Sequence, residues 1–279
     1  MSSMLEPGEA VSRVEACSVV AARRVAAMLD LDPSGIVEGE PLPRGWQFLM
    51  LGADTKRSDL RGDGFPGLGV PMPDLGLPRL LLGGRTVSYL ADIPIGATLH
   101  RASSIESLKR KSTESGPLAI LTILHELRIP NAVMPAIIET QTYLLQGAQK
   151  RFAQDINVGS SAPISADRTM AFVPDETLLF QYSALGFNTH KIHIDRAYAR
   201  DVEGYPDLVV NGGLTTLLLT EFLRRDLCLI PAAIKVRHIA PLFCRRAITF
   251  AATRNGETWN LKAFNETGRL AVDMAVETA

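Results

Sequence analysis

Two histidines three residues apart are the part of this sequence best suited to chemistry. His190 and His193 lie in the stretch YSALGFNTHKIHIDRAYA, residues 182–199, and the whole chain of 279 residues has only five histidines. A histidine near its reference pKa of about 6.5 can exchange protons at neutral pH, and it can also bind a metal ion. The stretch therefore allows an acid/base site, a metal site, or packing without chemistry.

The metal interpretation is the weakest of the three. A short His-x-x-His spacing followed by Asp195 is common by chance, and no further ligands cluster beside it in the sequence. The cysteines Cys17, Cys228 and Cys244 are widely separated and lack a zinc spacing, which predicts reduced thiols. We therefore expect no metal, and we expect Asp195 to cap the short helix that follows it.

A glycine pair after the histidines begins an apolar helix. Residues 208–227 read LVVNGGLTTLLLTEFLRRDL. Gly212 and Gly213 let a ligand approach the backbone closely, and the start of a helix favours negative charge. The backbone N–H groups after Asn211 could therefore meet an oxygen that gains charge during a reaction.

The second half of the chain must position these residues, and its patterns predict one long helix and several strands. The expected order is a strand, the histidine loop, a short helix, the apolar helix and then three strands. Turn signals at Asn255-Gly256 and at residues 266–268 mark the last strands. The expected bounds are 177–187 for the first strand, 195–205 and 214–227 for the helices, and 232–240, 246–256 and 257–277 for the last strands.

The first half also has a helix followed by a run of strands, with a long loop between them. Residues 11–32 are predicted to be helical, and residues 35–84 are so rich in Gly and Pro that we expect an ordered covering loop. Four strands should follow at 86–93, 97–111, 116–129 and 136–145. We therefore predict an α+β protein with a first domain at 1–146, a linker at 147–170 and a second domain at 171–279.

Composition limits the partners of the protein. The formal net charge is −1, which argues against a broad basic surface for nucleic acid or an anionic membrane. The apolar runs are shorter than the ~20 residues that span a bilayer, and the first residues show no signal-peptide pattern. We expect a soluble, cytoplasmic protein.

Two segments of the sequence resemble a known enzyme family. The stretches YSALGFNTHKIHID and EGYPDLVVNGG are similar to the MaoC-like hydratases and dehydratases. Within this family they resemble the branch of mitochondrial 3-hydroxyacyl-thioester dehydratases and of itaconyl-CoA and mesaconyl-CoA hydratases. LPRGWQFL, GDGFPGLGVPMP, LPRLLLGGR and SGPLAILTILHE resemble the first domain of that branch, so the similarity covers about residues 25–279.

The resemblance implies a double hot-dog fold, with two antiparallel sheets each wrapped around a long helix, and chemistry in the second domain. It implies reversible hydration of a 2-enoyl thioester, carried by coenzyme A or by the phosphopantetheine of an acyl carrier protein. His193 is expected to be the acid/base group and Gly212 the backbone donor to the thioester oxygen. Asn188, which stands at the position of the family's catalytic Asp, is expected to orient water. His190 would share proton transfer or only donate a hydrogen bond.

Several positions depart from the family pattern. Asn211 replaces a His, Gly213 a Pro, and Gly186 a Thr or Ser. Asn211 and Gly213 are expected to line the substrate site, and Lys235 and Arg237 to meet the phosphates of coenzyme A or of a carrier. The departures concern the expected acyl pocket, so they put the substrate in question.

We therefore predict a hydro-lyase, without metal or redox cofactor and, by family analogy, a homodimer. Three alternatives stay open. The protein could be a hot-dog thioesterase, for which Glu221 is the candidate carboxylate. It could be a specialised enzyme that adds or eliminates another group on a tailored thioester, or a non-catalytic acyl-binding protein.

Overall fold

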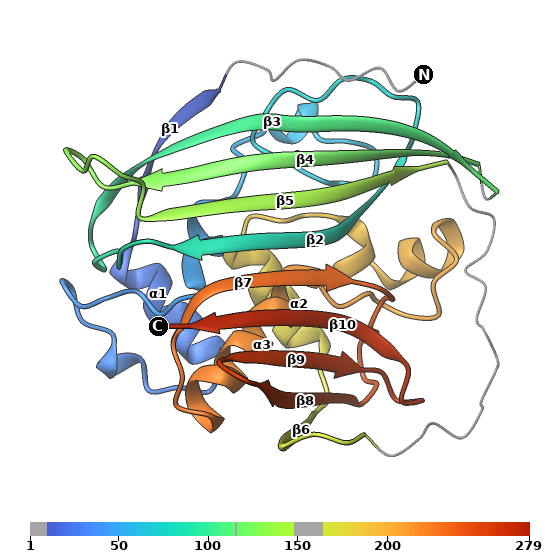
Figure 1. Cartoon of the computed structure of the whole chain (residues 1–279). Coiled ribbons are helices and arrows are strands. Elements are labelled where there is room, and N and C mark those ends of the chain that lie inside the picture. The colour runs from blue at the N-terminus through green and yellow to red at the C-terminus, as the bar shows by residue number, and fades with distance from the viewer. Residues whose placement is uncertain (1–9, 115, 148–163) are drawn as a thin grey trace. The chain divides into compact units, whose positions relative to one another are not determined.

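The computed structural model describes residues 10–114, 116–147 and 164–279 and divides into two compact units (Figure 1). One unit contains Met1–Leu60 and Pro66–Ala148, and the other contains Arg61–Phe65 and Gln149–Ala279. The five residues Arg61–Phe65 thus leave the first unit and join the second. The predicted linker 147–170 lies mostly outside the described residues, and its last residues already belong to β6 (Arg168–Phe172).

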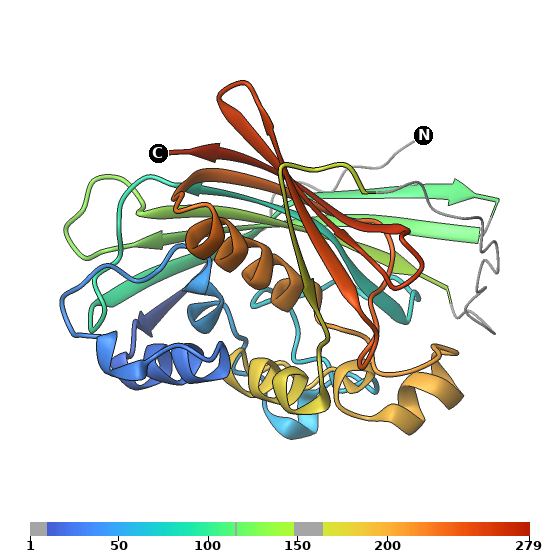
Figure 2. The same ribbon diagram turned by 90° about the horizontal axis from the view of Figure 1, so that it is seen from below.

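The second unit is an antiparallel sheet that packs against one long helix. The strands pair in the order β7-β10-β9-β8-β6, and α3 lies against β7, β8 and β9 (Figure 2). The bounds are α2 (Glu176–Leu185), α3 (Gly212–Asp226), β7 (Pro231–His238), β8 (Ile248–Asn255), β9 (Thr258–Phe264) and β10 (Leu270–Thr278). The predicted apolar helix is confirmed, and the predicted strand 257–277 is two strands around the turn at 265–268.

The long helix α3 is buried along almost its whole length. Every residue from Leu214 to Leu223 is buried, including Thr215, Thr216 and Thr220. Each of these threonines donates its hydroxyl to the backbone carbonyl four residues earlier, so none of them places an unpaired hydroxyl in the core. The helix can therefore carry polar residues in the core of this unit.

The first unit is a longer antiparallel sheet in the order β1-β3-β4-β5-β2. One face of β4 and β5 is buried at every second residue, as expected of strands whose sheet is packed on one face. The strands are β1 (Val11–Ala16), β2 (Arg79–Tyr89), β3 (Thr98–Thr113), β4 (Gly116–Arg128) and β5 (Ile137–Gln146).

The helical parts of the first unit are short. The longest described helix is α1 (Val19–Met28), with ten residues, and η2 (Trp46–Met50) adds the buried Trp46, Phe48 and Met50. Hydrogen bonds hold η2 on the sheet: Gln47 Nε2 donates to Glu139 Oε2 at 3.0 Å, and Arg101 Nη1 donates to the Met50 carbonyl at 2.9 Å. The long helix expected in each unit is thus found only in the second, among the described residues.

One predicted element is correct only in part, and another is wrong in type. Residues 11–32 are not one helix, because Val11–Ala16 alternates in burial and pairs with β3 as an edge strand, and α1 starts only after its cap Ser18. Residues 177–187 form most of α2 and the turn after it, and not a strand, because the Asp175 side chain accepts the Leu178 N–H and starts the helix. In both segments a capping residue decides where the helix begins.

The Gly/Pro-rich segment is an ordered loop, as expected, but it ends earlier than predicted. It contains η1 (Pro33–Gly35), η2 and η3 (Arg57–Asp59), and β2 starts at Arg79 with a bulge between Leu82 and Gly84. Across the described ranges, no helix combines the length and the apolar character needed to cross a membrane.

Candidate active site

His193 is held in one orientation by the backbone. It lies in η4 (Lys191–His193), is 8 % exposed, and its Nδ1 is 2.7 Å from the Val209 carbonyl oxygen. Because a carbonyl can only accept, Nδ1 must carry the hydrogen, and Nε2 is left with a free lone pair. Val209 N–H in turn donates to the Ile192 carbonyl at 2.9 Å, which fixes both partners.

Burial keeps both histidines neutral. It lowers the pKa of His193 to about 3, with a smaller contribution from His190 in the same direction, while the Val209 carbonyl raises it slightly. Burial also lowers the pKa of His190 to about 4, and Arg61 adds to this effect. The two rings lie nearly perpendicular, with their centroids 5.5 Å apart. Each neutral ring therefore has a nitrogen that can accept a proton at neutral pH, provided that a nearby group offsets the positive charge that forms.

A carboxylate from the Gly/Pro-rich loop faces His190. Asp63 is 8 % exposed, and its Oδ2 lies 3.7 Å from His190 Nε2 and 3.1 Å from Arg61 Nε. A distance of 3.7 Å is too long for a hydrogen bond, and a neutral imidazole forms no ion pair, so the contact with His190 is a close approach. The Phe65 ring packs edge-on against His190, 5.7 Å between centroids.

The loop Arg61–Phe65 is bound to the histidine segment by three hydrogen bonds. Thr189 Oγ1 donates to the Gly64 carbonyl at 2.6 Å, Lys191 N–H to the Asp63 carbonyl at 2.9 Å, and Lys191 Nζ to the Gly62 carbonyl at 2.8 Å. Gly64 has φ +80°, and a Cβ at this position would lie 2.5 Å from the Thr189 carbonyl oxygen. Only glycine fits there, which explains part of the motif GDGFPG.

Asn188 stabilises the turn before His190. Its Oδ1 accepts the His190 N–H at 3.1 Å, and its own N–H donates to the Ser183 carbonyl at 2.8 Å, which closes the end of α2. The amide nitrogen Nδ2 is the part of Asn188 that can donate to a water. The predicted role in orienting water therefore stays a prediction, now restricted to this donor and the second lone pair of Oδ1.

The start of α3 offers the predicted backbone donors. Gly212 and Gly213 are the first two helical residues, and no side chain caps this end of the helix. The first N–H groups of a helix have no partner within it, so they point toward any ligand placed there. Asn211 is 2 % exposed, and its Nδ2 lies 3.3 Å from Ser183 Oγ, while its Oδ1 has no hydrogen-bond partner among the described residues.

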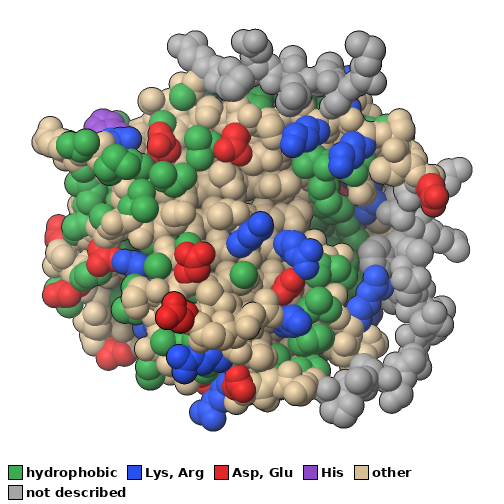
Figure 3. Space-filling view, in the orientation of Figure 1, with side chains coloured by type: hydrophobic (Ala, Val, Ile, Leu, Met, Phe, Trp, Pro, Cys, Tyr) green, Lys and Arg blue, Asp and Glu red, His purple; other side chains and the backbone are tan. Residues whose placement is uncertain are grey.

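Lys235 and Arg237 are placed differently from the other predicted residues. Both are exposed, and they alternate along β7 with the buried Ile234 and Val236, so they point away from the side of the strand that is packed. Arg237 is bound to Asp273, with Nη2 2.7 Å from Oδ2. Lys235 and Arg237 take no part in the contacts of His190 and His193 described above, and their role as phosphate contacts stays a prediction. On the face shown in Figure 3, basic side chains are scattered among acidic and apolar ones.

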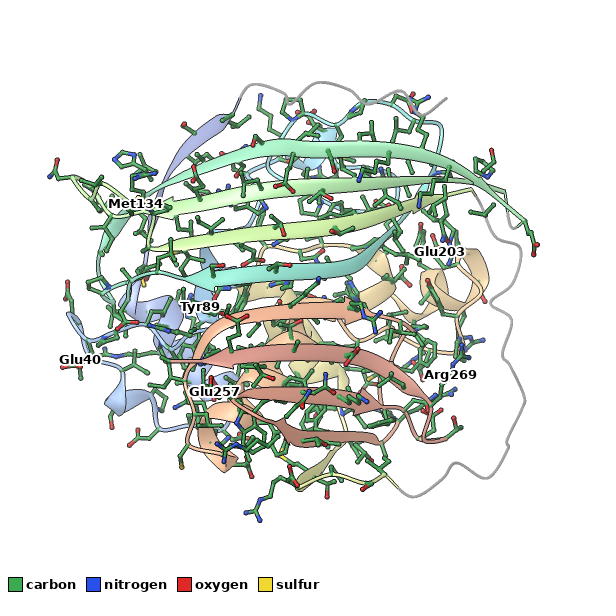
Figure 4. The ribbon with its side chains drawn as sticks, viewed as in Figure 1. Glu40, Tyr89, Met134, Glu203, Glu257 and Arg269 are labelled. Carbon is green, nitrogen blue, oxygen red and sulfur yellow. The ribbon has the colours of Figure 1, made fainter. Side chains whose placement is uncertain are left out.

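The remaining candidates are helix residues. Asp195 accepts the Tyr198 N–H at 2.9 Å, as expected of a cap, and the helical turn continues to Glu203, which is labelled in Figure 4. Glu221 is buried and pairs with Arg224. At a rise of 1.5 Å per residue, Glu221 lies about 13 Å along α3 from Gly212. This distance and pairing disfavour Glu221 as the carboxylate of a thioesterase.

Among residues 10–114, 116–147 and 164–279, no group of three metal-ligating side chains is placed to hold an ion.

Sequence reasoning missed the residues that position the histidines. Asp63, Gly64 and the Val209 carbonyl were not predicted, although GDGFPG was recognised as part of the family pattern. A backbone carbonyl leaves no trace in residue type. The only available signal for Asp63 was a carboxylate between two glycines in a loop of unusual length.

Comparison with solved structures defines the class of fold. A MaoC-like dehydratase from Phytophthora capsici superposes with a TM-score of 0.70 at 16% identity and covers 97% of this chain and 96% of its own. A conserved hypothetical protein from Mycobacterium tuberculosis, which has a double hot-dog fold, superposes with a TM-score of 0.57 at 13% identity, over 97% and 96% of the two chains. The prediction of an α+β double hot-dog fold is confirmed.

Sequence comparison defines the family. Residues 45–244 match the model of hydroxyacyl-thioester dehydratase type 2, and the chain belongs to this family. Mesaconyl-C(4)-CoA hydratase from Chloroflexus aurantiacus is 34% identical over 260 residues, which cover 92% of this chain and 91% of that protein. The predicted resemblance and the predicted enzyme class, a hydro-lyase, are confirmed.

Proposed function

We propose that this protein reversibly hydrates a 2-enoyl-CoA thioester, with His193 as the acid/base group. The observation that carries this proposal is the hydrogen bond between His193 Nδ1 and the Val209 carbonyl. It fixes the tautomer in which Nε2 can take a proton. Membership of the hydroxyacyl-thioester dehydratase family supports the reaction type.

The reaction can be written with one histidine in both proton transfers. His193 Nε2 removes a proton from water while the water oxygen bonds to C3. The electrons of the C2=C3 double bond then form an enolate that extends to the thioester oxygen. The proton on His193 Nε2 passes to C2, which restores the neutral histidine and gives the 3-hydroxyacyl thioester. Dehydration follows the same steps in reverse and needs no metal or redox cofactor.

The start of α3 would stabilise the enolate. The Gly212 N–H is the predicted donor to the thioester oxygen, and the first turn of the helix, which no side chain caps, suits a partial negative charge. A donor of this kind contributes about 3–4 kcal/mol to the transition state. Asn188 Nδ2 would hold the attacking water, since Asn188 Oδ1 already accepts the His190 N–H.

The similarity to mesaconyl-C(4)-CoA hydratase favours coenzyme A over an acyl carrier protein as the carrier, and a short branched acyl group as the substrate. The direction of the reaction in the cell, the homodimer and the cytoplasmic location stay predictions.

The test is to incubate the purified protein with crotonyl-CoA, mesaconyl-C(4)-CoA and itaconyl-CoA. Loss of the enoyl absorbance and the product mass would be followed together. We expect the gain of one water on at least one thioester, and a loss of about 10²–10⁴ in rate for His193→Gln. His100→Gln, which changes an exposed histidine on β3, is the matched control. A folded protein that adds water to none of these thioesters would overturn the proposal.

A further inference from the structure

A negative charge beside the buried histidine pair would favour the uptake of a proton, and the Asp63 carboxylate lies next to the pair. When His193 takes a proton from water, a positive charge forms on a residue that is 8 % exposed. A buried charge is costly unless an opposite charge or hydrogen bonds offset it. The Val209 carbonyl supplies one hydrogen bond to His193, and His190 lies against its ring. The carboxylate that reaches this pair is Asp63, through His190.

Asn188 cannot supply this charge. It is a neutral amide, and its Oδ1 already accepts the His190 N–H. Two charged groups that act on His190 are Asp63 and Arg61, and both come from the loop Arg61–Phe65. Of these two, only Asp63 can favour a positive charge on the histidine pair.

We propose that Asp63 is a positioning residue that holds His190 as the Nε2–H tautomer and offsets, through this ring, the charge formed on His193 during turnover. This inference rests on the proposed function. Oδ2 of Asp63 faces His190 Nε2 at 3.7 Å, which is beyond hydrogen-bond length, and catalytic contacts that are long in a free enzyme often shorten to hydrogen bonds in its complex with substrate. A carboxylate beside Nε2 keeps the hydrogen on this nitrogen.

The placement of Asp63 is built into the fold and is not a chance surface contact. The three hydrogen bonds between the loop Arg61–Phe65 and residues 189–191 fix its backbone. Its Oδ1 accepts the Phe65 N–H at 2.9 Å, which leaves Oδ2 for Arg61 and His190. The Phe65 ring covers His190 from the side and limits access of water, which strengthens the effect of the carboxylate.

The first test measures the tautomer directly and does not depend on activity. Long-range ¹H–¹⁵N spectra of histidine-labelled protein at neutral pH should show His190 as the Nε2–H form. Asp63→Asn keeps an acceptor for Phe65 N–H and removes the charge, so it should give a mixture of tautomers at His190 with His193 unchanged. An unaltered His190 signal in Asp63→Asn would overturn the inference.

The second test is a double-mutant cycle with kinetics. Asp63→Asn should lower kcat by about tenfold or more and change KM by less than about twofold, because the effect belongs to the transition state. His190→Gln should lower kcat as well, and adding Asp63→Asn to it should cause no further loss. Full additivity of the two losses would show that Asp63 does not act through His190.

The matched control is Asp207→Asn. Asp207 also accepts a backbone N–H, from Leu208 at 2.7 Å, and an arginine Nε, from Arg196 at 2.8 Å, so it controls for the loss of a loop ion pair. We expect its kcat to stay within about twofold of the parent chain. If the parent chain hydrates no thioester, the proposed function fails. If it is active and Asp63→Asn is equally active, only the inference about Asp63 fails.

Discussion

Gly64 is the residue at which a single added methyl group should separate the carboxylate from the histidines. Its φ of +80° is strained for any residue with a Cβ, and the Cβ of alanine would lie 2.5 Å from the Thr189 carbonyl oxygen. Nearly all real Cβ contacts are longer than 3.0 Å, so the loop Arg61–Phe65 must move away from residues 189–191. Gly64→Ala therefore acts on the loop that carries Asp63 and leaves every side chain of the site unchanged.

The size of the effect follows from two contributions. The left-handed backbone costs about 1–2 kcal/mol for alanine. Movement of the loop breaks the bonds from Thr189 Oγ1 to the Gly64 carbonyl and from Lys191 N–H to the Asp63 carbonyl, each worth about 1 kcal/mol. We expect the loop in Gly64→Ala to be destabilised by about 3–4 kcal/mol, the sum of these contributions.

Hydrogen exchange at the Lys191 amide is the most direct assay, since this N–H donates to the Asp63 carbonyl. Its protection should fall in Gly64→Ala, together with kcat. Gly62→Ala is the matched control in the same loop, because a Cβ there meets nothing within 4 Å, and its effect should stay within about 0.5 kcal/mol. Full protection of the Lys191 amide in Gly64→Ala would refute the reasoning.

Two further predictions concern stability at low pH and the central helix. An unfolded histidine titrates near 6.5, whereas burial lowers the pKa of His190 to about 4, so the unfolded chain binds more protons between these values. The free energy of unfolding should therefore fall as the pH is lowered from about 6.5 to about 4, by up to about 1.4 kcal/mol per pH unit for each such histidine. Urea unfolding of His190→Gln over this window should show a shallower decline than the parent chain, and an equal slope would contradict the buried neutral histidine. Glu221→Gln should keep hydration within about threefold and release no more free thiol than the parent chain, because Glu221 pairs with Arg224 far from Gly212. A loss of thioester hydrolysis in this variant, measured by thiol release, would instead favour the thioesterase alternative.

The sequence by itself determined the sheets, the central helix and the family. Strands β4 and β5 are long runs rich in apolar and β-branched residues and lie between turn residues, and such runs are a local property of the chain. The helix α3 was predicted from its apolar run after a glycine pair. The helix predicted at residues 11–32 was right for α1 and wrong for β1, and the strand predicted at 177–187 was wrong in type. The starts of α1 and α2 depend on the caps Ser18 and Asp175 rather than on hydrophobic pattern.

Only the tertiary structure decided which groups contact the two histidines and which ring nitrogen of His193 carries the hydrogen. The spacing of His190 and His193 predicted proton chemistry, but the tautomer of His193 depends on a backbone carbonyl at Val209, which any residue type could supply. The approach of Asp63 to His190 depends on a loop that crosses from the first half of the sequence into the second unit. Such contacts join residues far apart in the chain. Their energy comes from burial and from bonds between backbones, neither of which has a signature in local sequence.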